Sequence, residues 1–152
     1  MTQRILFATD FSPASAPAFR QAVAFCNGKR ASLLIAHVLE PPVPFTTEGY
    51  VVPQMYDELA AAVRAAAEKR MRRLLAGARK AGVRARGLLL QGAPHEAITR
   101  AARSHRVGQI VVGTHGRSGW SRLVLGSVAA RVIAASPCPV VVIPMKPKRR
   151  AS

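Results

Sequence analysis

Acidic, cysteine and aromatic residues are all scarce in this chain of 152 residues. Seven Asp and Glu residues stand against 23 Lys and Arg, which leaves a formal net charge of +16, and aromatic residues make up only 5%. A chain this basic attracts phosphates, nucleic acid or an anionic membrane, and the charge alone does not distinguish between them. The apolar fraction of 49% suffices for the core of one domain, so the composition excludes a disordered chain.

The two cysteines, Cys26 and Cys138, have no metal-ligand spacing and no CxxC partner, which argues against a zinc site. The N-terminus lacks the apolar segment of a secretory signal, and no apolar run reaches the ~18 residues of a membrane span. We therefore expect a cytoplasmic protein that has free thiols and does not enter a membrane.

The familiar motifs of nucleotide enzymes and hydrolases are also absent. There is no Gly-Lys-Ser/Thr of a Walker A loop and no G-x-G-x-x-G. The segment from Gly116 misses the nucleophile elbow by one position, because Trp120 stands where the second glycine belongs. His95-Glu96 lacks the second histidine of a zinc protease, and His115 has no nucleophile with supported triad geometry. We expect no catalytic residue and no protein-held metal.

Short apolar runs alternate with longer stretches of helical period, which predicts βαβ units and a parallel sheet. The five predicted strands are Arg4–Thr9, Ser32–Leu39, Val83–Leu90, Gln109–Gly113 and Val140–Pro144. The four predicted helices run from Pro13 to the Asn27-Gly28 stop, from about Met55 to Ala81, from Pro94 to His105 and from Ser127 to Ser136. The proline-rich connection Glu40–Gln54 is long for an α/β loop, which is typical of a functional lid or a mobile segment.

Ligands of a doubly wound sheet bind beyond the carboxyl ends of the strands, where the strand order reverses. The most informative such segment is Gly113–Val128, which is rich in glycine and leads from a strand into a helix. Glycine lets backbone N–H groups approach a phosphate, and a helix N-terminus adds partial positive charge. Ser127 offers a hydroxyl there, and Arg117 offers a cation. The pattern favours a phosphate site, with ordinary turn and cap residues as the alternative.

The spacing Gly113-x2-Gly116-x9-Gly126-Ser127, followed by a helix and SPCPVVVIP, resembles the ATP-binding branch of the universal stress protein family. The segments ILFATDFSPAS, LLIAHVLEP and QGAPHEAI match the family in the same order. The resemblance covers residues 1–145 and leaves a basic tail, 146–152. It implies a single α/β domain of the Rossmann-like, adenine nucleotide α-hydrolase-like type, with a five-stranded parallel sheet of order 3-2-1-4-5 and helices on both faces.

The resemblance also implies a ligand and a set of binding residues. The ligand is ATP, with ADP or AMP as alternatives and any Mg²⁺ held through the phosphates. The residues matching the adenine and ribose side are Ala8, Thr9, Asp10 and Val38. Those matching the ribose and phosphate side are Val112, Gly113, Gly116, Gly126, Ser127 and Val128, and Arg117 joins them as a cation. One departure is Gly108-Gln109, where the family commonly has Asp-Leu, at the far end of its strand.

The expected function is a nucleotide-dependent stress-response switch or adaptor with slow or no hydrolysis. Rapid hydrolysis needs a held metal and a group that orients water, and Asp10 is the one plausible acid at the site. The family pairs subunits through the fifth strand, here Val140–Ile143, so a homodimer is expected. Two alternatives stay open: a basic protein that associates with nucleic acid through the second helix and the tail, and a dimeric adaptor that nucleotide merely stabilises.

Overall fold

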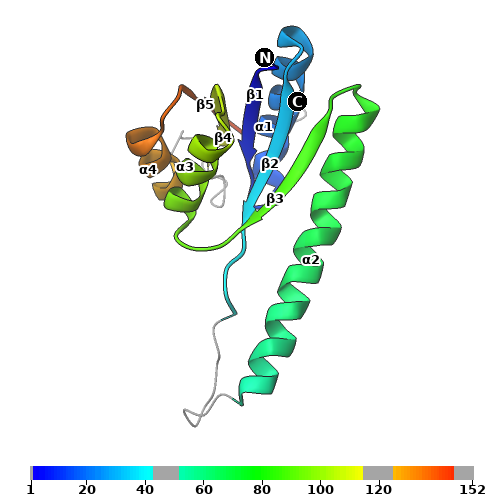
Figure 1. Cartoon of the computed structure of the whole chain (residues 1–152), viewed down its shortest axis with the longest axis vertical. Helices are drawn as coiled ribbons and strands as arrows, with labels where there is room; N and C mark the ends of the chain where they lie inside the picture. The colour runs from blue at the N-terminus through cyan, green and yellow to red at the C-terminus, as the bar shows by residue number, and fades with distance from the viewer. Residues whose placement is uncertain (1, 43–51, 115–124, 146–152) are drawn as a thin grey trace, which may run out of the picture.

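Five parallel strands form the centre of the molecule, and helices cover both faces of the sheet (Figure 1). The structure is a computed structural model that describes residues 2–42, 52–114 and 125–145. The strands are β1 (Arg4–Ala8), β2 (Ser32–Val38), β3 (Ala85–Leu90), β4 (Gln109–Gly113) and β5 (Val140–Ile143). Their order is β3-β2-β1-β4-β5 with every pair parallel, which confirms the predicted sheet and its strand order.

The helices are the single turn η1 (Pro13–Ser15), α1 (Ala16–Lys29), α2 (Pro53–Lys80), α3 (Pro94–Ser104) and α4 (Ser127–Ala135). Successive residues of β1 point to opposite faces. Ile5 and Phe7 pack with residues of α1 and α2, whereas Leu6 packs with residues of α3 and α4. All three side chains have 0% exposure, so β1 is the centre of both halves of the core.

The end of α1 differs from the prediction. The helix continues to Lys29, past the Asn27-Gly28 pair at which the sequence predicted a stop. The Asn27 side chain donates a hydrogen bond to the carbonyl of Ala81 at the end of α2, 3.2 Å away, so it ties two helices together. Arg30 takes the left-handed conformation, with φ 52°, and ends the helix in place of a glycine.

The apolar side chains along α2 are buried only in the C-terminal half of the helix. Met71 is buried and Leu74 and Leu75 are partly buried, whereas Leu59 is 47% exposed. Figure 1 shows why: α2 extends beyond the sheet at its N-terminal end. Gly82 follows the helix with φ +77°, a left-handed conformation in which glycine commonly ends a helix.

Several predicted features lie outside the described residues, namely Gly116, Arg117, the tail 146–152 and most of the connection Glu40–Gln54. Within the ranges that are described, none of the helices combines the length and the apolar character that crossing a bilayer requires.

Candidate functional site

The strand order reverses between β1 and β4, because β1 pairs with β2 on one side and with β4 on the other. The carboxyl end of the sheet at this point is where α/β proteins bind ligands. Among the sequence-predicted residues, Ala8 ends β1 and is followed by Thr9 and Asp10, Val38 ends β2, and Val112 and Gly113 end β4. The topology therefore brings segments far apart in the chain to one end of the sheet.

Gly113 lies against the turn that follows β1. A Cβ atom added to Gly113 would stand 3.2 Å from the backbone oxygen of Ala14 and 3.6 Å from the Cα of Ser15. This distance is shorter than most real Cβ contacts, so glycine allows the end of β4 to approach η1 closely. The glycine predicted to admit a phosphate therefore also has a packing role.

A chain of hydrogen bonds holds the turn between β1 and η1. The Phe11 N–H donates to Thr9 Oγ1 at 2.9 Å, and Thr9 Oγ1 lies 3.0 Å from Ser15 Oγ. Ser15 Oγ donates to the Ser12 carbonyl at 2.7 Å, so its proton is used and the Thr9 hydroxyl must donate to Ser15. Asp10 Oδ1 accepts from the Ser12 N–H at 2.9 Å. Local bonds thus fix the backbone next to the predicted site.

His37 of β2 contacts this turn through Phe11 and Thr9, which belong to the turn. The rings of Phe11 and His37 are 4.2 Å apart between centroids, and His37 Nδ1 lies 2.8 Å from the carbonyl oxygen of Thr9. Phe11 has φ 61°, in the left-handed region that a bulky residue rarely occupies. Such strain persists only where surrounding contacts impose it, and it is common at binding sites.

The predicted residues differ in how much of each remains accessible. Thr9 is 8% exposed and Val112 is 6% exposed, so little of either side chain is available to a ligand. Asp10, Ser127 and Val128 are exposed, and Ala8, Val38, Gly113 and Gly126 are intermediate. Val38, Ala8 and Val112 belong to the same apolar cluster beneath the carboxyl end of the sheet.

Gly126 is the N-cap of α4, and Ser127 is its first residue. No side chain caps this N-terminus and no acidic residue lies in the first turn. The first N–H groups of a helix have no intrahelical acceptor, so they are donors for an anion. Gly126 has φ −63° and ψ 154°, an ordinary extended conformation that any residue adopts.

The described residues give little support for a covalent nucleophile or for a metal site. Burial raises the pKa of the Cys26 thiol to about 11, so this thiol stays protonated at neutral pH. No three His, Cys, Asp or Glu side chains gather closely enough to hold a metal ion in the part of the chain that the structure describes. What the site offers is backbone donors, hydroxyls and one carboxylate.

Sequence reasoning placed His37 at the carboxyl end of its strand, where ligands bind, but it did not identify Phe11 and Ser15 as part of this arrangement. The Ser12-Pro13 signal predicted a helix start, and in the structure it begins a single 3-10 turn that brings Ser15 back to Thr9. The pairing of Phe11 with His37 had no sequence signal, because the two lie on different segments and Phe is an unusual residue at positive φ.

Comparisons with known proteins agree on one family. The model of the family described as "Universal stress protein family" matches residues 1–144. A universal stress protein of Thermus aquaticus is 34% identical over 143 residues, which cover 94% of this chain and 99% of the relative.

Two solved structures extend this likeness to the fold. The universal stress protein UspA of Lactobacillus plantarum superposes with a TM-score of 0.78 at 26% identity, covering 93% of this chain and 97% of that one. A universal stress protein crystallised in complex with cAMP superposes with a TM-score of 0.66 at 26% identity, covering 93% and 96%.

Proposed function

Because this chain belongs to the universal stress protein family, we propose that it binds an adenine nucleotide at the carboxyl end of its sheet. It acts as a nucleotide-dependent switch or adaptor in a stress response, with slow or no hydrolysis. One observation carries the proposal: the hydrogen-bonded turn after β1 and the end of β4 meet at the reversal of strand order, the position that α/β proteins use for ligands.

The residues present suit an adenine nucleotide. Ala8 and Val38 offer apolar surface to a base, and the carboxylate of Asp10 accepts from a ribose hydroxyl or a base amine. The uncapped N-terminus of α4, with Gly126 and Ser127, donates to phosphate oxygens, and Gly116 and Arg117 are proposed to join it. The cAMP complex of a relative with the same fold supports an adenine nucleotide as the ligand class.

ATP is the proposed ligand, with ADP and AMP as alternatives, and Mg²⁺ would be held through the phosphates. The described residues contain no carboxylate cluster that holds a metal or orients water. Asp10 already accepts from the Ser12 backbone, which reduces its capacity to act as a base. Turnover should therefore be slow, well below the ~1 per second at the lower end of typical enzymes.

The decisive variant is Gly126→Ala, measured by calorimetric titration with ATP, ADP and AMP. Its backbone conformation accepts alanine without strain, so the fold is kept while the methyl group crowds the phosphates. We expect at least about a tenfold loss of affinity, equivalent to one phosphate hydrogen bond. Gly113→Ala is a poorer test, because its methyl group would press on the Ala14 backbone and perturb the fold itself.

Two results would refute the proposal. One is wild-type protein that shows no affinity for any adenine nucleotide and releases none on denaturation, as judged by mass spectrometry. The other is steady-state ATP hydrolysis near ~1 per second or faster, which would make the protein an enzyme. A switch further requires that partner binding differ with and without ATP, because a ligand with equal affinity for both states shifts no equilibrium.

We also propose a homodimer that pairs through β5. This strand is the outer strand beside β4, and Ile110 N–H and Thr114 N–H donate to the carbonyls of Pro139 and Ile143. The backbone groups of alternate residues point to opposite sides of a strand. Those of Val140 and Val142 therefore point away from β4 and are free to pair with a second copy.

Val142→Pro tests this pairing, because proline removes one outward N–H and leaves the hydrogen bonds to β4 in place. We expect the variant to sediment as a monomer in analytical ultracentrifugation and Val142→Thr, which keeps the N–H, to sediment as a dimer. Equal dimer content in the two variants would exclude pairing through this strand.

A further inference from the structure

A hollow of about 630 Å³ lies at the opposite end of the sheet, among the amino ends of β1, β2 and β3 and the end of α3. Four arginines line it: Arg4, Arg84, Arg86 and Arg106. We call this hollow the arginine groove. Ser32 and Ser104 also line it, and the guanidinium groups are its main hydrogen-bond donors.

The positive charge of the groove is not neutralised within the described residues. Neither Asp nor Glu is among the lining residues. None of the four arginines makes an ion pair with a described acidic residue. All four side chains are exposed, so their guanidinium groups are available to a ligand in solution.

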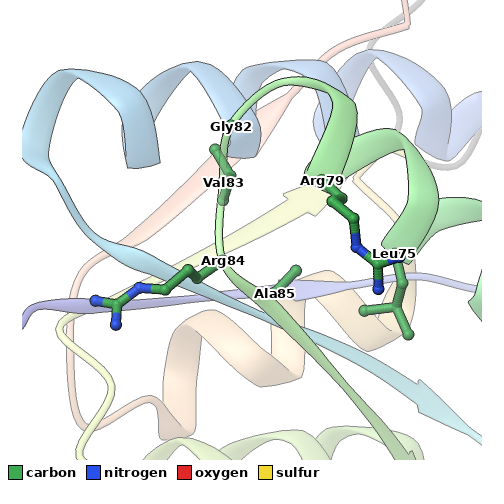
Figure 2. Close-up of a pocket in the computed structure, with 6 residues that line it drawn as sticks. All are labelled: Leu75, Arg79, Gly82, Val83, Arg84 and Ala85. Atoms are coloured by element: carbon green, nitrogen blue, oxygen red, sulfur yellow. The ribbon is translucent and has the colours of Figure 1, made fainter.

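The positive surface continues around the turn between α2 and β3. A smaller hollow of about 400 Å³ lies there, lined by Arg79 from α2 and Arg84 before β3. Figure 2 shows these two side chains beside Gly82 and Val83. Arg84 lines both hollows, so the two are adjacent. The guanidinium groups of Arg79 and Arg84 point away from one another (Figure 2), which spreads the charge over an extended surface.

Two of the arginines are held in place by the backbone. Arg4 donates from Nη1 to the carbonyl oxygen of His105 at 2.8 Å, which links the start of β1 to the end of α3. Arg106 occupies the left-handed region, with φ 51°, after the end of α3. Glycine is the residue usually found there, because it avoids the steric cost of this conformation.

Helix dipoles explain only part of this charge. Cations are favoured near helix C-termini, and α2 and α3 both end at this end of the sheet. However, Arg4 and Arg86 belong to strands, and Arg84 directly precedes one. The clustering of strand arginines around one hollow therefore requires a further reason.

We propose that the arginine groove binds a linear chain of phosphates, of which inorganic polyphosphate is the simplest member. The arginines are distributed across β1 and β3, which are separated by β2 and so lie about 10 Å apart at ~4.8 Å per strand spacing. Four guanidinium groups spread over this width can contact several phosphates of one chain at the same time. Guanidinium groups bind phosphate oxygens in pairs, which suits a repeated phosphate.

The lining favours a ligand without bases. No Phe, Tyr or Trp and no Asn or Gln is among the groove residues that the structure describes. Proteins that bind single-stranded nucleic acid usually stack its bases on aromatic side chains, and they read base edges with amide or guanidinium groups. Among the described lining residues, the guanidinium groups can bind phosphates, and His105 offers the one ring on which a base could stack.

The test measures binding of a short-chain inorganic polyphosphate to the full-length protein by fluorescence titration at several salt concentrations. The variant Arg84→Gln/Arg86→Gln removes two groove cations, and Arg72→Gln/Arg73→Gln removes two exposed cations of α2 that do not line the groove. We expect at least about a tenfold loss of affinity in the first variant, with a salt dependence reduced by about two charges. The second variant should change affinity by less than about threefold.

Thermal unfolding shows whether each variant is folded, and ATP titration separates this site from the nucleotide site. Wild-type polyphosphate affinity in Gly126→Ala, together with unchanged ATP affinity in Arg84→Gln/Arg86→Gln, would support two separate sites. Loss of polyphosphate binding in Gly126→Ala would place the chain at the nucleotide site and overturn the proposal.

Two further outcomes would also overturn it. One is equal weakening in the groove variant and the α2 variant, which would mean that net charge alone attracts the polyanion. The other is equal or tighter binding of a single-stranded oligonucleotide with the same dependence on Arg84 and Arg86. That result would make the groove a nucleic-acid site.

Discussion

The two ends of the β-sheet are built from different chemistry. At the carboxyl end, Thr9, Ser12 and Ser15 fix the backbone by hydrogen bonds within seven residues of one another. At the amino end, arginines from distant parts of the chain surround an open hollow and share few hydrogen bonds with the backbone. Local hydrogen bonds order the carboxyl end of the sheet, whereas clustered positive charge distinguishes the amino end.

The difference follows from the topology of parallel βα units. Helix N-termini lie at the carboxyl end of the sheet, where unsatisfied N–H groups attract an anion through the backbone. Helix C-termini lie at the amino end, where the partial charge is negative and only side chains can attract an anion. One fold can therefore present two anion-binding surfaces. The surface made of backbone N–H groups follows from the βα architecture itself, whereas the other depends on which side chains the sequence supplies.

Thr9→Val removes the hydroxyl that holds the turn at the carboxyl end of the sheet. It gives the larger of the two predicted changes in the free energy of unfolding. Thr9 is 8% exposed, and its hydroxyl accepts from the Phe11 N–H and donates to Ser15. Valine has nearly the same shape but no hydroxyl, so the Phe11 N–H loses its acceptor and Ser15 loses its donor. We expect the free energy of unfolding to fall by about 1–3 kcal/mol in urea denaturation.

Thr9→Ser is the matched control, since it keeps the hydroxyl and loses only a methyl group. We expect nucleotide affinity to fall in Thr9→Val and to be largely kept in Thr9→Ser, because the turn positions Asp10. If both variants were equally stable, the hydroxyl chain would have no role in ordering this end of the sheet.

The contrast between the ends also explains what the sequence could predict. The five strands and their parallel pairing were predictable, because apolar periodicity is a local signal, whereas the order of the strands followed from the resemblance to the universal stress protein family. In α/β folds, ligands bind beyond the carboxyl ends of the strands, so a residue at such an end is a candidate for the ligand site. The Asn27-Gly28 stop was wrong, because the Asn27 side chain bonds to Ala81, a contact between helices that no local pattern contains.

The arginine groove could not be predicted, because its residues have no shared motif. Arg4 and Arg84 stand 80 positions apart in the sequence and approach one another only through the pairing of β1 with β2 and of β2 with β3. Sequence analysis named the second helix and the tail as the basic surface in the alternative of nucleic-acid association. The structure gathers four arginines at the strand starts instead, in a hollow with no acidic lining residue among those described.

Arg106→Gly gives the smaller stability effect and separates stability from binding at the amino end. Arg106 has φ 51°, so glycine relieves backbone strain and should raise the free energy of unfolding by about 0.5–1 kcal/mol. The same change removes a groove cation, so polyphosphate affinity should fall while stability rises.

Arg30→Gly is the control, because Arg30 has φ 52° and does not line the groove. It should gain similar stability and keep most of the affinity. Urea denaturation and polyphosphate titration of both variants measure the two quantities. A purely structural arginine at position 106 would instead give equal affinity in the two variants, since both lose one positive charge near the amino end of the sheet.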